Sequence, residues 1–236
     1  MAVRGMNNMN VTNFDNAQEI TEFLTKDITN KLGVAIERNG SASIVVSGGR
    51  SPIALFNALS HAELDWSKVV ISLVDDRWVN STHENSNELL VNTHLLINQA
   101  NAATFIGLVG EQASAFDGVE DAITKFSAIK QIDVMILGMG EDGHTASIFP
   151  CCEQLDDAMS VDNNNRLIAT KPNTAPFERI SLTLNEILSA KHVYLPLSGE
   201  GKVKVFETAK QLTDYKQMPI AAVINQHNAL DVLLSK

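Results

Sequence analysis

Apolar residues along this chain fall into two patterns, a helical recurrence every three to four positions and short unbroken runs. Between residues 14 and 38 they return at the spacing of one helical face, which predicts a long amphipathic helix ended by Gly40. Short runs bounded by glycine or charged residues predict buried strands at residues 43–46, 69–74, 104–109 and 134–137. Helical spacing between these runs predicts further helices at residues 53–59, 84–97 and 116–129.

This alternation of helices and strands predicts an α/β fold up to residue 150. It favours a mostly parallel, doubly wound, Rossmann-like sheet with helices on both faces. The chain contains no internal repeat and no low-complexity linker, so we expect a single domain over residues 14–236 behind a loose N-terminal leader at residues 1–13. In a parallel sheet the loops that follow the strands open on one edge, where open α/β folds keep their ligand sites.

The remainder of the chain is less regular. We expect one helical turn at residues 145–149, closed by Pro150, and a polar surface excursion at residues 156–165. Alternating residues predict a half-buried strand at residues 178–184. The other predicted elements are strands at residues 166–170, 192–197 and 221–225, a possible edge strand at residues 230–234, a short helix from Asn185 to Ala190, and a helix that begins near Lys202 and runs to about Leu212.

Composition and charge restrict the possible partners. The formal net charge of −10 argues against nucleic acid and anionic membranes, so an anionic ligand needs a local basic pocket. Apolar runs are too short for a membrane span, and the N-terminal residues carry no signal-peptide core, which favours the cytoplasm. The two cysteines, Cys151 and Cys152, are adjacent and are expected to be free thiols.

The loops after three of the predicted strands carry the candidate chemistry. Residues 47–52 place a Gly-Gly turn and hydroxyls before a helix that starts at Pro52, an arrangement that points backbone N–H groups at an anion. Taken alone, such a turn is more often a plain tight connection between strand and helix. Residues 75–77 place two acids and an arginine after the next strand, where a solvated ion pair is the structural alternative. Residues 138–144 end the third strand with a glycine-rich loop that contains Asp142 and His144.

The segments SGGRSP, DDRWV followed by ENSN, GMGEDGHTASIFP, FERISLTLNEIL and SGEGK occur in this order. This order resembles that of 6-phosphogluconolactonases, which belong to a wider group of sugar-phosphate isomerases and deaminases. The resemblance covers residues 14–234, and GxGxDGHTASxFP is its most specific part. The related deaminases continue differently after the histidine and carry a glutamate that is missing here.

The resemblance implies hydrolysis of 6-phospho-D-glucono-1,5-lactone to 6-phospho-D-gluconate, the second step of the oxidative pentose phosphate pathway. His144 is the candidate general base, because a neutral imidazole can take a proton from water near neutrality. Asp142 is expected either to orient this imidazole or to stabilise a turn. Asp75 matches the position of an acid that isomerising members use for proton transfer, and here it is expected to position substrate hydroxyls.

Arginine and lysine suit a phosphate ligand, and glycine and serine offer backbone and hydroxyl donors. The expected substrate-binding residues are Gly48, Gly49, Ser51, Asp75, Arg77, Asn85, Gly140, Gly143, Arg179 and Lys202.

Other classes of function fit less well. The chain has no Gly-x-Ser-x-Gly elbow for a serine nucleophile, and His144 has no second histidine or cysteine at metal-ligand spacing. We therefore expect neither a metal nor a cofactor. The alternatives are a sugar-phosphate isomerase or deaminase, and a non-catalytic sugar-phosphate sensor on the same fold. The expected partner is a small phosphorylated sugar lactone, and the sequence is compatible with a monomer or a weak homodimer.

Overall fold

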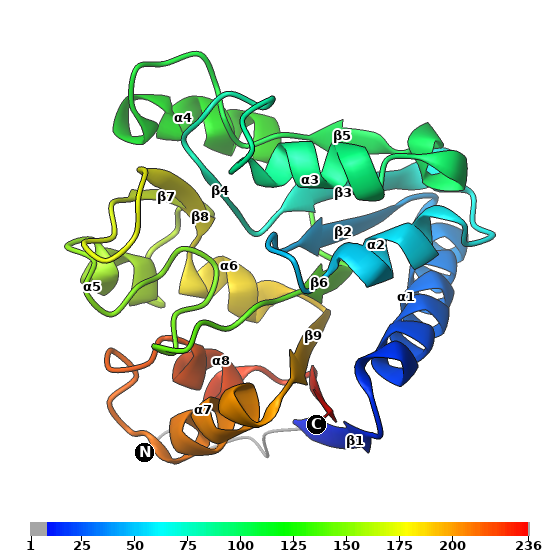
Figure 1. Cartoon of the computed structure of the whole chain (residues 1–236). Coiled ribbons are helices and arrows are strands. Elements are labelled where there is room, and N and C mark those ends of the chain that lie inside the picture. Colours follow the sequence, from blue (N-terminus) through cyan, green and yellow to red (C-terminus); the bar gives the residue numbers. More distant parts are fainter. Residues whose placement is uncertain (1–8, 236) are drawn as a thin grey trace.

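The computed structural model describes residues 9–235, and within them the central element is a seven-stranded parallel sheet (Figure 1). Its strands, in spatial order, are β1 (Asn10–Phe14), β10 (Leu230–Ser235), β9 (His192–Ser198), β6 (Val134–Ile136), β2 (Ala42–Val46), β3 (Val69–Leu73) and β5 (Thr104–Ile106). Every pairing in this sheet is parallel. All residues of β2 and β6 are buried, as continuous apolar runs in a sheet covered on both faces require. The predicted α/β class is therefore confirmed.

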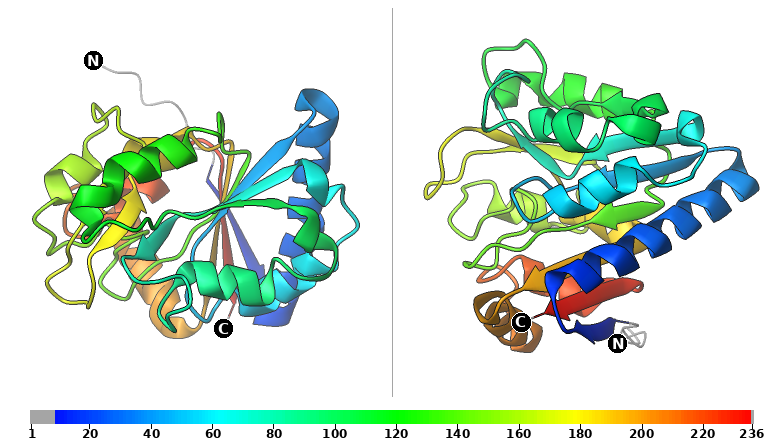
Figure 2. Two further views of the ribbon diagram at one scale, coloured as in Figure 1. Left: turned by 90° about the horizontal axis from the view of Figure 1, so that it is seen from above. Right: turned by 45° about the vertical axis from the view of Figure 1, so that its right-hand side comes forward.

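Helices cover both faces of this sheet, and Figure 2 shows α1 and α4 on opposite sides of it. The helices are α1 (Ala17–Asn39), α2 (Ile53–Ser60), α3 (Asn87–His94), α4 (Ala115–Phe126), α5 (Leu155–Met159), α6 (Leu184–Ser189), α7 (Glu200–Gln211) and α8 (Ile220–Gln226), with short 3-10 helices at Trp66–Lys68 and Asn98–Ala102. The predicted first helix is confirmed. Asn16 caps it by accepting from the Glu19 N–H, and Gly40 ends it with a φ of 80°. No helix within residues 9–235 combines the length and the apolar character that crossing a bilayer requires.

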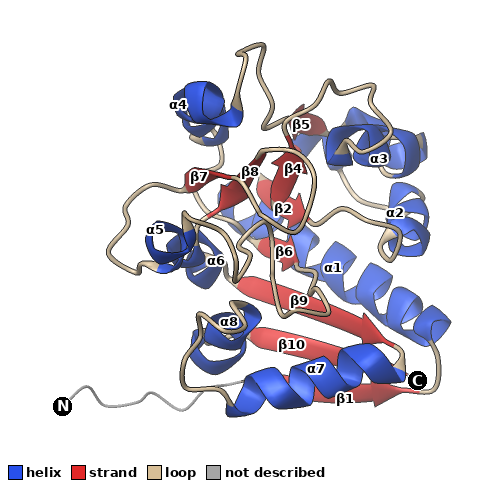
Figure 3. Ribbon diagram, turned by 60° about the vertical axis from the view of Figure 1, so that its left-hand side comes forward, coloured by secondary structure: helices blue, strands red, loops and turns tan. Residues whose placement is uncertain are grey.

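A second sheet, which the sequence pattern did not predict, stands beside the first (Figure 3). It is antiparallel, in the order β4 (Asp75–Arg77), β8 (Arg179–Leu182) and β7 (Leu167–Thr170). Its register places Arg77 opposite Arg179 and Asp75 opposite Ser181. All four residues of β8 are buried, so the segment expected to be a half-buried strand is covered on both faces.

Two predictions near the C-terminus are wrong. Residues 221–225 are not a strand but the centre of α8, whose residues Ile220–Ile224 are all buried. A fully buried helix shows the same unbroken apolar run as a buried strand, so periodicity could not separate the two. Residues 230–234 form β10, which pairs with both β1 and β9 and is therefore not an edge strand.

Other local predictions need correction. The leader expected at residues 1–13 includes most of β1. The first four residues of this strand are exposed and mostly polar, so their pattern resembles that of a loop. Residues 1–8 of the expected leader lie outside the described part of the chain. The expected polar excursion at residues 156–165 overlaps a helix, α5, which begins at Leu155. Thr183, and not Asn185, caps α6 by accepting from the Glu186 N–H. Residues 145–149 form no helical turn, because Thr145 and Ile148 pair as an antiparallel bridge.

Candidate active site

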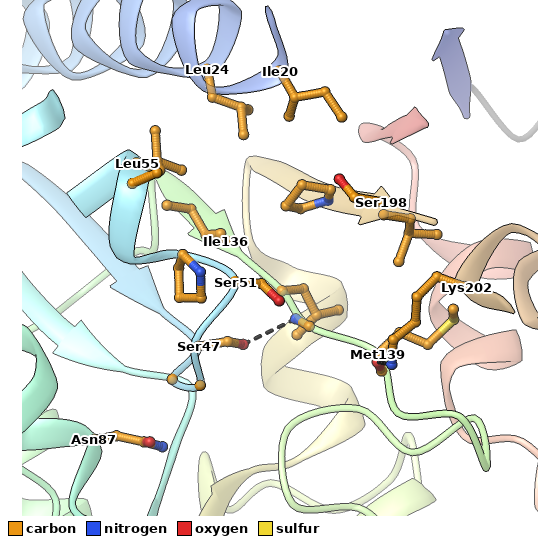
Figure 4. A pocket seen from close by; sticks show the side chains of 18 of the residues that line it. Ile20, Leu24, Ser47, Ser51, Leu55, Asn87, Ile136, Met139, Ser198 and Lys202 are labelled. Atoms are coloured by element: carbon orange, nitrogen blue, oxygen red, sulfur yellow. Dashed lines mark hydrogen bonds between the residues drawn. The ribbon is translucent and has the colours of Figure 1, made fainter. Parts of the chain in front are cut away.

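A cavity of about 640 Å³ lies at the carboxyl ends of the central strands. The loops after β2, β3 and β6 all reach it, as the rule for parallel sheets predicts. The predicted site residues that line it are Gly48, Gly49, Ser51, Asp75, Arg77, His144, Arg179 and Lys202. One wall is apolar, and Figure 4 shows Ile20 and Leu24 of α1 facing Leu55 of α2 there.

His144 is held at its edge and at its face. Its Nδ1 lies 2.6 Å from Oδ1 of Asp142, and the same oxygen accepts from the His144 backbone N–H at 3.1 Å. This contact assigns a proton to Nδ1 and leaves Nε2 as the nitrogen that can accept one. The imidazole also stacks on the ring of Phe149, with 4.0 Å between centroids and 20° between planes. The sequence prediction includes Asp142 but omits Phe149.

Two glycines predicted to bind substrate do not line the cavity. A Cβ on Gly140 would stand 2.1 Å from Nδ1 of His144, so this glycine makes room for the contact between His144 and Asp142. A Cβ on Gly143 would stand 2.5 Å from the side chain of Met218. Both positions therefore shape the loop, and neither touches the cavity directly.

Arg77 and Arg179 lie opposite each other in the pairing of β4 with β8. Like charges placed opposite each other across two strands destabilise the pairing. Burial lowers the pKa of the Arg179 guanidinium, and nearby Arg77 lowers it further, against the opposing effect of Asp75. Both Nε atoms are buried and have no hydrogen-bond partner among residues 9–235. Two crowded guanidiniums that line the cavity are suited to binding an anion.

Asn85 does not line the cavity, contrary to its predicted role in substrate binding. Its carbonyl oxygen accepts from Nη1 of Arg77 at 2.7 Å, and it thereby holds this guanidinium in place. Asn87, which the prediction omits, does line the cavity, and its Nδ2 donates to the carbonyl of Asp75 at 2.8 Å. A Cβ on Gly48 would stand 1.8 Å from Oδ1 of Asn87, so the close approach of these two loops requires glycine.

Asp76 does not line the cavity, but it holds the backbone around Arg77 and Asn87 in place. It is fully buried, and it accepts backbone N–H groups of Arg77, Asn87 and Glu88 at 2.8, 2.7 and 3.0 Å. Burial raises its pKa to about 6, against the opposing effect of these three donors. Asp76 thus fixes the backbone at two residues of the cavity wall.

Ser147 lies between Asp75 and Arg179, and the sequence prediction omits it. Its hydroxyl donates to Oδ2 of Asp75 at 2.5 Å and accepts from Nη1 of Arg179 at 3.4 Å. The direct distance from Arg179 Nη1 to Asp75 Oδ2 is 4.0 Å. Ser147 is fully buried, and its backbone N–H donates to the Ser181 hydroxyl of β8 at 3.0 Å. The Ser147 hydroxyl therefore bridges the Asp75 carboxylate and the Arg179 guanidinium, which make no direct hydrogen bond.

Lys202 and the Gly-Gly turn complete the polar wall. Lys202 extends from the first turn of α7, and its Nζ donates to the carbonyl of Met139 at 2.6 Å. Gly49 has a φ of 91°, a conformation that favours glycine over residues with a side chain. The Ser47 hydroxyl accepts from the N–H of Gly138 at 3.0 Å, which ties the turn to the loop after β6 (Figure 4).

Comparisons with known proteins show which family this chain resembles over most of its length. A 6-phosphogluconolactonase of Neisseria meningitidis is 42% identical over 214 residues, which are 90% of this chain and 92% of the relative. One of Pseudomonas aeruginosa is 38% identical over 209 residues, 88% of each chain. The crystal structure of a 6-phosphogluconolactonase from Shewanella baltica superposes with a TM-score of 0.94 at 40% identity, covering 98% of this chain and all of that one. Residues 15–232 match the family described as glucosamine-6-phosphate isomerases/6-phosphogluconolactonase, and the chain belongs to this family.

Proposed function

We propose that this protein hydrolyses 6-phospho-D-glucono-1,5-lactone to 6-phospho-D-gluconate, in the oxidative pentose phosphate pathway. The observation that carries the proposal is that one cavity combines a histidine held by a carboxylate with two crowded arginines. The first pair suits activation of water, and the second suits a phosphate group. The activity for which the relatives are named needs both.

In the proposed reaction, Nε2 of His144 takes a proton from water as the water oxygen attacks the lactone carbonyl. The tetrahedral intermediate then collapses, the bond from the carbonyl carbon to the ring oxygen breaks, and the imidazolium returns its proton to that oxygen. Asp142 holds the imidazole in one tautomer and stabilises its charged form, as the carboxylate of a catalytic triad does. Asp75 is placed to accept hydrogen bonds from sugar hydroxyls.

The phosphate is bound by Arg77, Arg179 and Lys202, with backbone N–H groups of the turn at residues 48–51. A phosphate dianion offsets the repulsion between the two guanidiniums. This local basic group explains how an acidic protein with a formal charge of −10 can bind an anionic substrate. The free cysteines fit the cytoplasm, a reducing compartment.

The test is hydrolysis of freshly prepared lactone, measured against its spontaneous rate, by the wild type and His144→Asn. A wild type well above the spontaneous rate, with a loss of at least ~100-fold in the variant, is expected for a general base. Full activity in the variant would refute the role of His144. An inert wild type that still binds 6-phosphogluconate would identify a sensor, and one that binds nothing would reject the substrate.

The phosphate contacts are tested separately by Arg179→Ala and Lys202→Ala, each of which is expected to raise KM. Lys204→Ala is the matched control, because Lys204 lies on the same helix but does not line the cavity. Unchanged saturation curves for both cavity variants would contradict the phosphate assignment.

A further inference from the structure

The segment that follows His144 turns back on itself. Thr145 and Ile148 pair as an antiparallel bridge, with the Ile148 N–H donating to the Thr145 carbonyl at 2.9 Å. Ala146 makes this possible by adopting a φ of 50°, which is uncommon for a residue other than glycine. In a helix, side chains five positions apart point about 140° away from each other. The tight turn instead returns Phe149 to the side of His144.

The ring of Phe149 contacts two groups of the site at once. The His144 imidazole stacks on it at 4.0 Å, and the Arg179 guanidinium carbon lies 5.2 Å from the same ring centroid. Phe149 is only 4% exposed, so the surrounding protein holds its ring in place. The His144 side chain is 30% exposed and has fewer restraints of its own.

We propose that Phe149 is a positioning residue that fixes the plane of the His144 imidazole and its placement relative to Arg179. This inference rests on the proposed function. Asp142 restrains the imidazole at one edge, but a single hydrogen bond leaves the ring free to tilt about it. Stacking on Phe149 removes that freedom. The face of an aromatic ring also attracts cations, so the contact strengthens when the imidazole carries the proton taken from water.

The kinetic test is Phe149→Leu, which keeps an apolar side chain and removes the aromatic face. We expect kcat to fall about 10-fold through His144 and KM to rise several-fold through Arg179, the size of one lost cation–π contact each. The kcat effect should vanish in the His144→Asn background, and the KM effect in the Arg179→Ala background. Equal losses of kcat with and without His144 would overturn the proposal. Phe177→Leu is the matched control, since Phe177 contacts His83 edge-on and does not line the cavity.

A second measurement needs no variant at Phe149 and no activity. Protons of an imidazole stacked on a benzene ring are shifted upfield in the NMR spectrum, and the His144 signals can be assigned by their loss in His144→Asn. Upfield His144 signals in the wild type support the stacking, and signals at the positions of a free imidazole overturn it. An inert wild type with shifted signals would defeat the proposed function alone. An active wild type with unshifted signals would defeat this inference alone.

Discussion

Ser147→Ala removes one hydroxyl from the buried contact between Asp75 and Arg179. In the wild type this hydroxyl donates to Oδ2 of Asp75 at 2.5 Å and accepts from Nη1 of Arg179 at 3.4 Å. Asp75 is 6% exposed and Arg179 is 7% exposed, so little solvent surrounds either group although both line the cavity. The variant leaves a buried carboxylate with Arg179 at 4.0 Å as its nearest cation.

The size of the effect follows from the charge on Asp75. A hydrogen bond to a charged group contributes about 1.5–3 kcal/mol, whereas one between neutral groups contributes about 1 kcal/mol. Ser72 offers the neutral comparison, because it is also fully buried and its hydroxyl donates to the Ile106 carbonyl at 2.8 Å. We therefore expect Ser147→Ala to lower the free energy of unfolding by about 0.5–2 kcal/mol more than Ser72→Ala.

Urea unfolding at neutral pH gives this difference directly, provided that the slope with denaturant is the same in both variants. Kinetics supply a second readout. Without the bridging hydroxyl, the Arg179 guanidinium loses one of the contacts that place it toward the proposed phosphate site. We expect KM to rise several-fold, with a smaller change in kcat. Equal destabilisation by Ser147→Ala and Ser72→Ala, with unchanged KM, would refute this account of the bridge.

Two further predictions concern the supports of the site. Gly140→Ala places a Cβ 2.1 Å from Nδ1 of His144, so we expect the imidazole to move and kcat to fall at least ~10-fold. Stability in urea should change little, because the His144 side chain is partly exposed. A normal kcat would contradict this steric role of Gly140. Asp76 has a folded-state pKa of about 6, above its ordinary value of 3.8, so its protonation stabilises the fold below pH 4 and this stabilisation is lost as the pH rises through 6. The difference between these pKa values corresponds to about 3 kcal/mol, so the stability of Asp76→Asn relative to wild type should rise by up to that amount between pH 4 and 7. If urea unfolding gives the same stability difference between Asp76→Asn and wild type at pH 4 and at pH 7, burial does not raise the pKa of Asp76.

The sequence predicted the convergence of the cavity because that convergence follows from local pattern and one topological rule. Buried strands end before Ser47, Asp75 and Gly138, and parallel strands all open on one edge. It did not predict that β4 pairs with β8, since residues 77 and 179 meet only through a contact distant in the chain. The crowding of Arg77 and Arg179 was therefore invisible in the sequence.

Gly140 was assigned the wrong role, and Ser147 and Phe149 were missed, each for a physical reason. A glycine in a loop can let a ligand approach, or it can let another side chain approach, and Gly140 does the second. Ser147 and Phe149 reach the site only because Ala146 takes a left-handed conformation that alanine seldom adopts. The local sequence of residues 145–149 favours a helical turn, but the segment instead forms the bridge between Thr145 and Ile148.

The two sheets contribute different residues to the cavity wall. The segments that follow the parallel strands supply the Gly-Gly turn, His144 and Lys202, whereas the antiparallel sheet supplies Arg77 and Arg179. A lactone bound as proposed presents its reacting carbon to the loop after β6 and its phosphate to the arginines of β4 and β8, to Lys202 and to the turn at residues 48–51. Phe149 and Ser147 lie in the segment that follows β6 and precedes β7. Phe149 contacts both His144 and Arg179, and Ser147 bridges Asp75 and Arg179. The turn at residues 145–149 therefore contacts both the proposed base and the proposed anion site, so we expect changes in this turn to alter kcat and KM together.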